Sequence, residues 1–274
     1  MKSPEDGSEA GAAGDRTAHG AALTAADFGL RGPRGWAFRH VRIDAGPGAL
    51  IAVEGPSGSG RTCLLLALTG RMRSTEGRAE VGGLPLRRGR GLAAVRRISA
   101  LGPVPGVSDL DPALTVAEHL RERASLLRRF DGSLPAPLRP RAERAARTHG
   151  RIDTALEAAG LDPSALPKGE RTAVRDLERL EALRLSVALA LIGGPRLLAV
   201  DDLDLKLSDA GRDEAWRLLR SVAAGGVTVL AVCGQAPGDA DVVVRTQDRP
   251  ERSGPAGTPD ERRTADALAG TGRA

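Results

Sequence analysis

A glycine-rich segment contains the residue types best suited to bind a charged ligand. It comprises Gly55, Pro56, Ser57, Gly58, Ser59, Gly60, Arg61 and Thr62. The glycines let the backbone curl until successive N–H groups face one point, and a following helix adds partial positive charge there. A polyphosphate is the ligand that this arrangement favours, and Thr62 offers a hydroxyl to Mg²⁺. The segment therefore predicts a phosphate-binding P-loop.

One position departs from this motif, because Arg61 stands where lysine is usual. A guanidinium is bulkier and forked, so the exchange is not conservative. Lysine is rare throughout this arginine-rich chain, which has only Lys2, Lys168 and Lys206. Either this bias replaced the lysine while binding survived, or the site has lost function. We expect binding to survive and catalysis to suffer; an ordinary Gly/Ser turn is the remaining alternative.

The second half of a P-loop site is an aspartate that follows an apolar strand and holds Mg²⁺ through water. The run Leu197–Val200 leads directly into Asp201. An aspartate after a strand can also be a simple turn residue, but the pairing with the P-loop favours the metal site. Thr62 and Asp201 are therefore the predicted metal-binding residues.

Short apolar runs alternate with longer amphipathic segments, which is typical of an α/β sheet covered by helices. The runs predict strands at 50–54, 98–101, 197–200 and 227–232, and the amphipathic segments predict helices at 62–69, 115–129, 151–159, 177–192 and 209–224. We expect a helical subdomain at about 105–180, interrupted by a Pro- and Arg-rich loop at 131–150. Composition predicts disordered tails at 1–21 and 248–274 around a folded body at 22–247.

Composition limits the functional classes. The 274 residues are 41% hydrophobic and 27% charged, with a net charge of +5, which suits a soluble globular domain. Basic residues are scattered among acids and lack stacking aromatics, so we expect no nucleic-acid partner. Cys63 and Cys233 fit free thiols in a reducing cytoplasm. The N-terminus is acidic rather than a secretory signal, and the longest apolar run, 185–192, is too short to span a bilayer.

The order and spacing of these segments resemble the ATP-binding cassette (ABC) ATPases over about 23–246. The family's pattern of an apolar strand, two acids and a further helix is matched by Pro195–Asp202 and 207–219, and its last core strands by 226–233 and 239–244. Segment 114–120 resembles the opening of the family's helical subdomain. The resemblance implies a P-loop NTPase of ABC type, with a mostly parallel core sheet, an N-terminal antiparallel β subdomain and a helical subdomain. It implies ATP and Mg²⁺ as ligands.

Against this family pattern, the residues for hydrolysis look eroded. The water-polarising carboxylate is usually glutamate, and here it is Asp202, with an acid group one methylene shorter. The position of the family's histidine is occupied by Gly234, and the position of its glutamine falls near Gly102. The chain has no tyrosine to stack on adenine, and Trp36 or Phe28 could take that role. The family's signature falls on Leu177–Glu181, which reads more simply as the start of an amphipathic core helix.

The leading hypothesis is therefore an ATP-binding subunit of an ABC transporter with weak or absent hydrolysis. It would lie at the inner face of the membrane through a separate transmembrane subunit, and could pair with itself or with another cassette subunit. The alternative is a non-catalytic, cassette-fold interaction or regulatory protein. A P-loop kinase fits poorly, because no lid-like arginine cluster accompanies an acceptor site.

Overall fold

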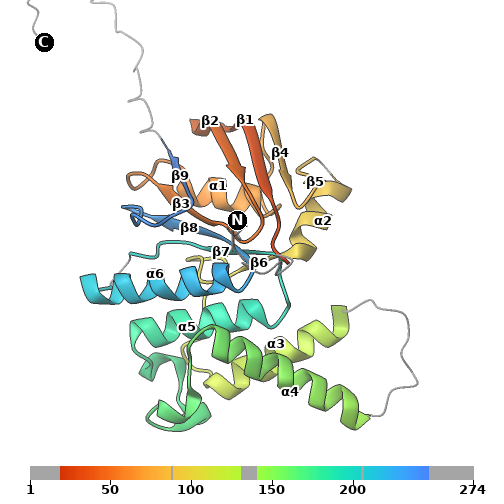
Figure 1. Ribbon diagram of the computed structural model, residues 1–274, viewed down its shortest axis with the longest axis vertical. Helices are drawn as coiled ribbons and strands as arrows, with labels where there is room; N and C mark the ends of the chain where they lie inside the picture. Colours follow the sequence, from red (N-terminus) through yellow and green to blue (C-terminus); the bar gives the residue numbers. More distant parts are fainter. Residues whose placement is uncertain (1–18, 88, 131–140, 205–206, 247–274) are drawn as a thin grey trace, which may run out of the picture.

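The computed structural model describes residues 19–87, 89–130, 141–204 and 207–246. Figure 1 shows an antiparallel sheet above a parallel sheet, with helices below the parallel sheet and a further pair of helices at the bottom of the view. The predicted tails at 1–21 and 248–274 lie almost wholly outside the described residues. Residues 19–21 are described, and of these Gly20 and Ala21 are buried. Ala21 is fully buried, and its N–H donates to the carbonyl of Arg196 at 3.0 Å.

The parallel sheet positions the phosphate loop. Its strands lie in the order β6-β7-β8-β3-β9, and every described pairing is parallel. The strands are β3 (Leu50–Glu54), β6 (Ser99–Leu101), β7 (Leu197–Val200), β8 (Thr228–Cys233) and β9 (Val242–Arg245). Because the strands run the same way, the loops after β3, β7 and β8 all leave from one edge. The segments that follow these three strands therefore meet.

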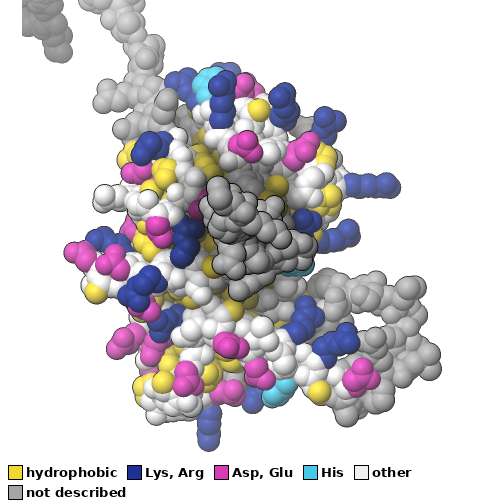
Figure 2. All heavy atoms as spheres, viewed as in Figure 1, with side chains coloured by type: hydrophobic (Ala, Val, Ile, Leu, Met, Phe, Trp, Pro, Cys, Tyr) yellow, Lys and Arg dark blue, Asp and Glu magenta, His cyan; other side chains and the backbone are white. Residues whose placement is uncertain are grey.

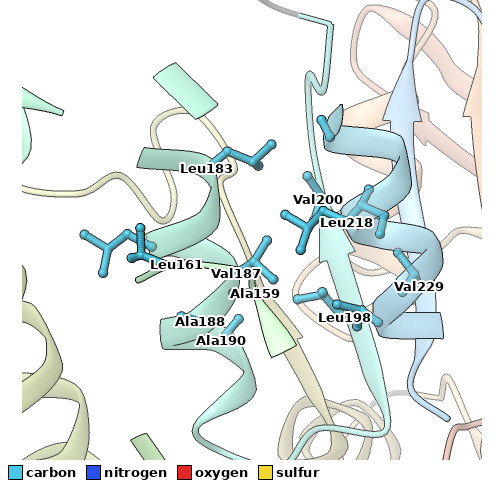
Figure 3. Packing of buried hydrophobic residues seen from close by; sticks show 14 of the residues in the cluster. Ala159, Leu161, Leu183, Val187, Ala188, Ala190, Leu198, Val200, Leu218 and Val229 are labelled. Carbon is cyan, nitrogen blue, oxygen red and sulfur yellow. The ribbon is translucent and has the colours of Figure 1, made fainter. Parts of the chain in front are cut away.

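Alternating side chains of the parallel sheet build two cores. In β7, Leu198 and Val200 belong to the cluster shared with helices α5 (Arg179–Leu191) and α6 (Asp209–Ala224). Leu197 and Ala199 belong to the cluster shared with helix α1 (Arg61–Leu68) and the antiparallel sheet. Figure 3 shows the first cluster, with Leu183 and Val187 of α5 facing β7 from one side and Leu218 of α6 near it. Burial on both faces explains why these strands are continuous apolar runs.

The antiparallel sheet covers the other side of α1. It has the strand order β2-β1-β4-β5, with β1 (Leu23–Gly32), β2 (Gly35–Ala45), β4 (Glu76–Val81) and β5 (Leu84–Pro85). Phe28 and Phe38 pack in its core with ring centroids 5.7 Å apart. The expected fold class, a P-loop α/β fold with an antiparallel subdomain, is confirmed by these two sheets.

The described helices account for most of the remaining body. They are α1 (Arg61–Leu68), α2 (Arg90–Ile98), α3 (Val116–Phe130), α4 (Arg141–Ala158), α5 (Arg179–Leu191) and α6 (Asp209–Ala224), with short 3-10 turns at Pro163–Ala165, Gly169–Arg171 and Val174–Asp176. The helices α3 and α4 lie between β6 and β7 in sequence, as the sequence predicts for a helical subdomain.

Two local predictions are wrong. The segment 141–150, assigned to a Pro- and Arg-rich loop, is the first half of α4. The prolines at 135, 137 and 140 all precede it, and the alanines at 142, 145 and 146 favour helix. Ile98, assigned to a strand, is the last residue of α2, and β6 begins at Ser99. Residues 131–140 of the predicted loop lie outside the described part.

Candidate functional site

The glycine-rich segment connects the end of β3 to the start of α1. Two of its glycines have left-handed backbone, with φ values of 83° at Gly58 and 87° at Gly60. At Gly60 the fit is also tight, since a Cβ would lie 1.9 Å from the carbonyl oxygen of Ala37 on β2. Only glycine satisfies both conditions at this position. The loop is therefore held against the antiparallel sheet.

The other side of the loop packs against the residue after β9. Ser59 and Thr246 share a hydrogen bond between their hydroxyls at 2.6 Å, and Thr246 N–H donates to the Glu54 carbonyl at 2.9 Å. A Cβ at Gly55 would approach the Thr246 hydroxyl to 2.2 Å. Sequence reasoning missed Thr246 and Ala37, because nothing local indicates which distant strand ends beside the loop.

The start of α1 carries no side-chain cap among the residues that the structure describes. Its first intrahelical bond runs from Leu64 N–H to the Gly60 carbonyl at 2.9 Å, so the N–H groups before Leu64 are the usual unpaired donors of a helix N-terminus. Together with the helix dipole, these donors are suited to bind an anion. A helix that leaves them uncapped is suited to receive phosphate oxygens.

The structure brings Asp201 to the same place. Asp201 follows β7 and is 3% exposed, and its carboxyl lies beside the Thr62 hydroxyl. Burial raises the pKa of this carboxyl; the neighbouring Thr62 hydroxyl and the charge of Arg61 oppose that shift, and Asp202 adds to it. The P-loop and Asp201, which the sequence analysis paired although they lie far apart in the chain, are therefore neighbours in the structure.

Thr62 and Asp201 provide a chemically suitable pair for Mg²⁺. Both offer hard oxygen ligands, and among the described residues no arginine or lysine forms an ion pair with Asp201, although the charge of Arg61 acts on it from further away. A buried carboxylate without a counter-ion is destabilising unless a cation joins it. The residues present therefore fit a divalent cation held together with phosphate oxygens.

This arrangement predicts a trade-off between stability and metal binding at Asp201. Because burial raises the folded-state pKa, ionised Asp201 lowers the free energy of unfolding above the carboxyl's ordinary pKa of 3.8. In the nucleotide-free protein, Asp201→Asn is expected to raise Tm at pH 7, with a gain that shrinks as pH falls toward that value. Thermal melts across this pH range test it, with Asp213→Asn, on the exposed face of α6, as the control. A wild-type Tm equal to or above the variant's at pH 7 would contradict it.

Arg61 does not reach into open space. Its Nη1 donates to the carbonyl of Cys233 at the end of β8, at 2.5 Å. The next residue, Gly234, donates its N–H to the Asp204 carboxylate. The position where the family pattern has histidine is therefore occupied by backbone, with an acid beside it.

Asp202 lies beside Asp201 and does not itself belong to the Thr62–Asp201 pair. Its φ is 47°, and its N–H donates to Asp201 Oδ1 at 3.0 Å. With Asp201 and Arg179 it lines a small cavity of about 190 Å³. The carboxylate predicted to polarise water is thus next to the site, on strained backbone.

The structure also describes the signature position and Gly102, where the sequence departs from the family pattern. At the signature position, the side chain of Glu178 accepts from the backbone of Glu181, and Glu181 accepts from Glu178 N–H at 2.8 Å, so the two residues cap α5 reciprocally. This supports the interpretation as the start of a core helix. Gly102 is buried, and its N–H donates to the Ala199 carbonyl at 2.8 Å.

The two aromatic candidates for adenine stacking differ. Phe28 is 1% exposed and packs on Phe38, so it has no free face. Trp36 is half-buried on β2, directly before Ala37, and the Arg31 guanidinium lies 5.8 Å from its ring centroid. Of the two, only Trp36 is placed near the loop with an accessible surface.

Both cysteines are free thiols, as the sequence predicts. Cys233 is buried, and burial raises its pKa to about 12, with the acids Asp204 and Glu54 adding to the shift and Arg61 opposing it. The pKa of Cys63 is raised by burial and by Asp201. Neither thiol is activated as a nucleophile.

The fold and this site define a nucleotide-binding cassette: a P-loop between β3 and α1, with an acid-bearing strand beside it. The model of the ABC transporter family matches residues 38–203. The chain belongs to the ABC transporter family.

Curated relatives agree with this family assignment. The chain is 31% identical over 191 residues to Nod factor export ATP-binding protein I of Cupriavidus metallidurans, covering 70% of this chain and 55% of the relative. It is 30% identical over 200 residues to methionine import ATP-binding protein MetN 2 of Burkholderia mallei, covering 71% and 44%. The chain thus spans about half the length of the curated relatives it matches.

Solved structures show the same fold. The dimeric cassette MJ0796 bound to ADP and Pi superposes with a TM-score of 0.58 at 21% identity, covering 78% of this chain and 88% of that one. CbiO1 of Clostridium perfringens, part of the ABC transporter complex cbiONQ, gives 0.60 at 18% identity and 78% of both chains.

Proposed function

We propose that the chain is the ATP-binding subunit of an ABC-type transporter and that it binds Mg-ATP at the P-loop with weak or absent hydrolysis. The observation that carries the proposal is the contact between Thr62 of the P-loop and the buried Asp201. An uncapped helix start and a buried acid with no ion pair among the described residues together suit one ligand, a polyphosphate with its Mg²⁺. In this proposal residues 55–62 hold the phosphates, and Thr62 and Asp201 hold the metal.

The proposal of weak hydrolysis rests on the groups around that ligand. Hydrolysis of a phosphoanhydride depends on a positioned water and on charge stabilisation at the γ-phosphate. Asp202 carries the water-positioning role in this proposal, with a shorter side chain than glutamate, and Gly234 offers no side chain. The Mg²⁺ would supply neutralisation of phosphate charge when bound. We therefore assign slow turnover to water positioning rather than to binding.

The proposed partners follow from the family. Within the described ranges, no helix has the length and apolar character needed to cross a membrane. We propose that a separate transmembrane subunit holds the cassette at the inner face of the membrane. The relatives are named for export and for import, so the proposal does not specify a direction. Pairing with a second cassette, of the same or another kind, is part of the proposal.

One observation favours a second function, a non-catalytic regulatory or interaction protein of cassette fold. Glu178 and Glu181 occupy the signature position and satisfy each other's backbone. A helix start already capped by two carboxylates has neither the donors nor the charge to receive a phosphate. In this alternative, nucleotide binding is incidental.

Calorimetry with ATP separates the two. In the full chain, Thr62→Val is expected to weaken Mg-dependent ATP binding on the order of tenfold to hundredfold, because the isosteric change removes a hydroxyl from the metal pair. The control is Thr69→Val at the C-cap of the same helix, where the Thr69 hydroxyl donates to the Leu65 carbonyl at 2.9 Å, away from the loop. If wild type binds no ATP, or if both variants bind equally, the proposal fails and the second function is favoured.

A further inference from the structure

One peptide group at the end of β8 is bonded to a cation on one side and to an acid on the other. The Nη1 of Arg61 donates to the carbonyl of Cys233 at 2.5 Å, and the N–H of Gly234 donates to the Asp204 carboxylate. Both bonds belong to the peptide that joins Cys233 to Gly234. This peptide is trans, so its C=O and N–H point in opposite directions. Arg61 and Asp204 therefore lie on opposite sides of it.

Each of these charges strengthens the bond on the other side of the peptide. A peptide dipole has its negative end at the carbonyl oxygen and its positive end at the N–H. A guanidinium at the oxygen and a carboxylate at the N–H both lie at the favourable end, and hydrogen bonds that share a peptide polarise one another. Asp204 thus strengthens the bond between the Cys233 carbonyl and Arg61 through the peptide.

Arg61 is bound in this way at the cavity that the phosphate loop borders. Residues 55–57 of the loop line this cavity of about 520 Å³, and Arg61 and Gly234 line it as well. The other basic residue of the lining, Arg245, pairs with Glu54 at 3.3 Å. Among the ion pairs of the described residues, none involves Arg61. Arg61 is therefore the basic side chain of this lining that is suited to phosphate oxygens, yet a carbonyl already accepts from it.

The end of β8 lies where the outer phosphates of a nucleotide would pass. In the sheet β8 is between β3, which leads into the loop, and β7, which leads into Asp201 (Figure 1). A polyphosphate held by the loop and by a metal at Thr62 and Asp201 would extend over this strand end. Burial raises the pKa of Asp201 and of Cys233, and the charge of Arg61 opposes both shifts. The guanidinium therefore lies in the region that the phosphates need.

We propose that Asp204 is a positioning residue of the nucleotide site: through the peptide between Cys233 and Gly234 it keeps Arg61 on β8, and a bound polyphosphate draws Arg61 away. Binding forms bonds between phosphate and guanidinium but breaks the bond to the Cys233 carbonyl. The net affinity is therefore lower than the phosphate bonds alone would give. The inference rests on the proposed function, because it describes how the same P-loop admits its ligand.

Titration calorimetry on the full chain tests this with Mg-ATP and, without metal, with inorganic tripolyphosphate. Asp204→Asn keeps the shape of the side chain and removes its charge, so it is expected to tighten the binding of both ligands on the order of fivefold. If Asp204 only supported the fold, the same change would leave the affinity equal or lower. The control is Asp213→Asn, which removes one negative charge from exposed α6 and is expected to stay within about twofold of wild type.

A double-variant cycle separates an action through Arg61 from a direct effect of the lost charge on the phosphates. In an Arg61→Met background no guanidinium remains to be released, so adding Asp204→Asn is expected to change the affinity by less than about twofold. An equal gain in both backgrounds would show plain repulsion between Asp204 and phosphate, and it would overturn the inference. Unchanged or weaker binding by Asp204→Asn alone would overturn it as well.

The carbonyl carbon of Cys233 gives a second measurement that needs no change at Asp204. Its NMR shift reports its hydrogen bond, and saturating tripolyphosphate is expected to move the wild-type signal to the position found in Arg61→Met. A signal that stays in place while the ligand binds overturns the inference, even if Asp204→Asn fails to fold. If wild type binds neither ligand, the proposed function fails, and the inference fails with it when Asp204→Asn also binds neither. Wild-type binding without the gain in Asp204→Asn rejects the inference alone.

Discussion

A Gly60→Ala variant is expected to bind ATP at least about 100-fold more weakly than wild type. The new Cβ would lie 1.9 Å from the Ala37 carbonyl, on backbone with φ of 87°. Strain of this kind costs about 1–3 kcal/mol, and displaced loop N–H groups lose charge-assisted bonds of about 1.5–3 kcal/mol each. Calorimetric titration with Mg-ATP measures the loss.

The matched control is Gly83→Ala in the turn between β4 and β5. Gly83 has a φ of 77°, yet a Cβ there meets nothing within 4 Å. The Gly83→Ala change adds only backbone strain, at a site away from the P-loop. The ATP affinity of this variant is therefore expected to stay within about twofold of wild type. Circular dichroism establishes that both variants fold. A folded Gly60→Ala protein with wild-type affinity would show that the loop does not hold the nucleotide.

The largest gain is expected from Asp202→Glu combined with Gly234→His. This pair is expected to raise ATP turnover on the order of 100-fold or more over wild type, since it extends the water-positioning carboxylate and adds a side chain at the end of β8. The backbone accepts the changes. Gly234 is not among the described glycines with positive φ, and a Cβ there lies 3.3 Å from Asp204, which must shift slightly. Asp202 has a φ of 47°, so glutamate carries a modest stability cost.

Turnover is measured at saturating Mg-ATP for wild type, each single variant and the pair, with Asp213→Glu on exposed α6 as the control. Each single variant is expected to give only part of the gain, because positioning groups act together. A wild-type rate of about 10 s⁻¹, ordinary for enzymes, would refute the proposed impairment. A double variant that binds ATP and stays as slow as wild type would place the defect elsewhere, with Arg61 and the signature position as the next sites to test.

One face of the molecule shows how its charged side chains are distributed. On the face shown in Figure 2, basic and acidic side chains of the described residues are interspersed rather than gathered in one stripe.

Local pattern predicted much of this protein. The strand at 50–54 and the helix at 209–224 were predictable to the residue, because buried strands and capped amphipathic helices follow from hydrophobic period and turn chemistry. The glycines at 55, 58 and 60 indicated a curled backbone, and Gly58 and Gly60 have positive φ. The metal-binding role of Asp201 stays a prediction. By contrast, helix at 141–150 was missed, since the prolines before it suggested a longer loop.

Hydrophobic periodicity indicates which face of a helix or strand is buried, but it does not indicate which other element packs against that face. Only the tertiary structure decided that Ala37 of β2 lies over Gly60, that Thr246 supports Ser59, and that Arg61 bonds to the end of β8. It also brought Arg71, Arg96 and Arg123 from three segments to one cleft. Such contacts join residues far apart in the chain, and the packing of whole layers sets them, so no spacing within the sequence encodes them.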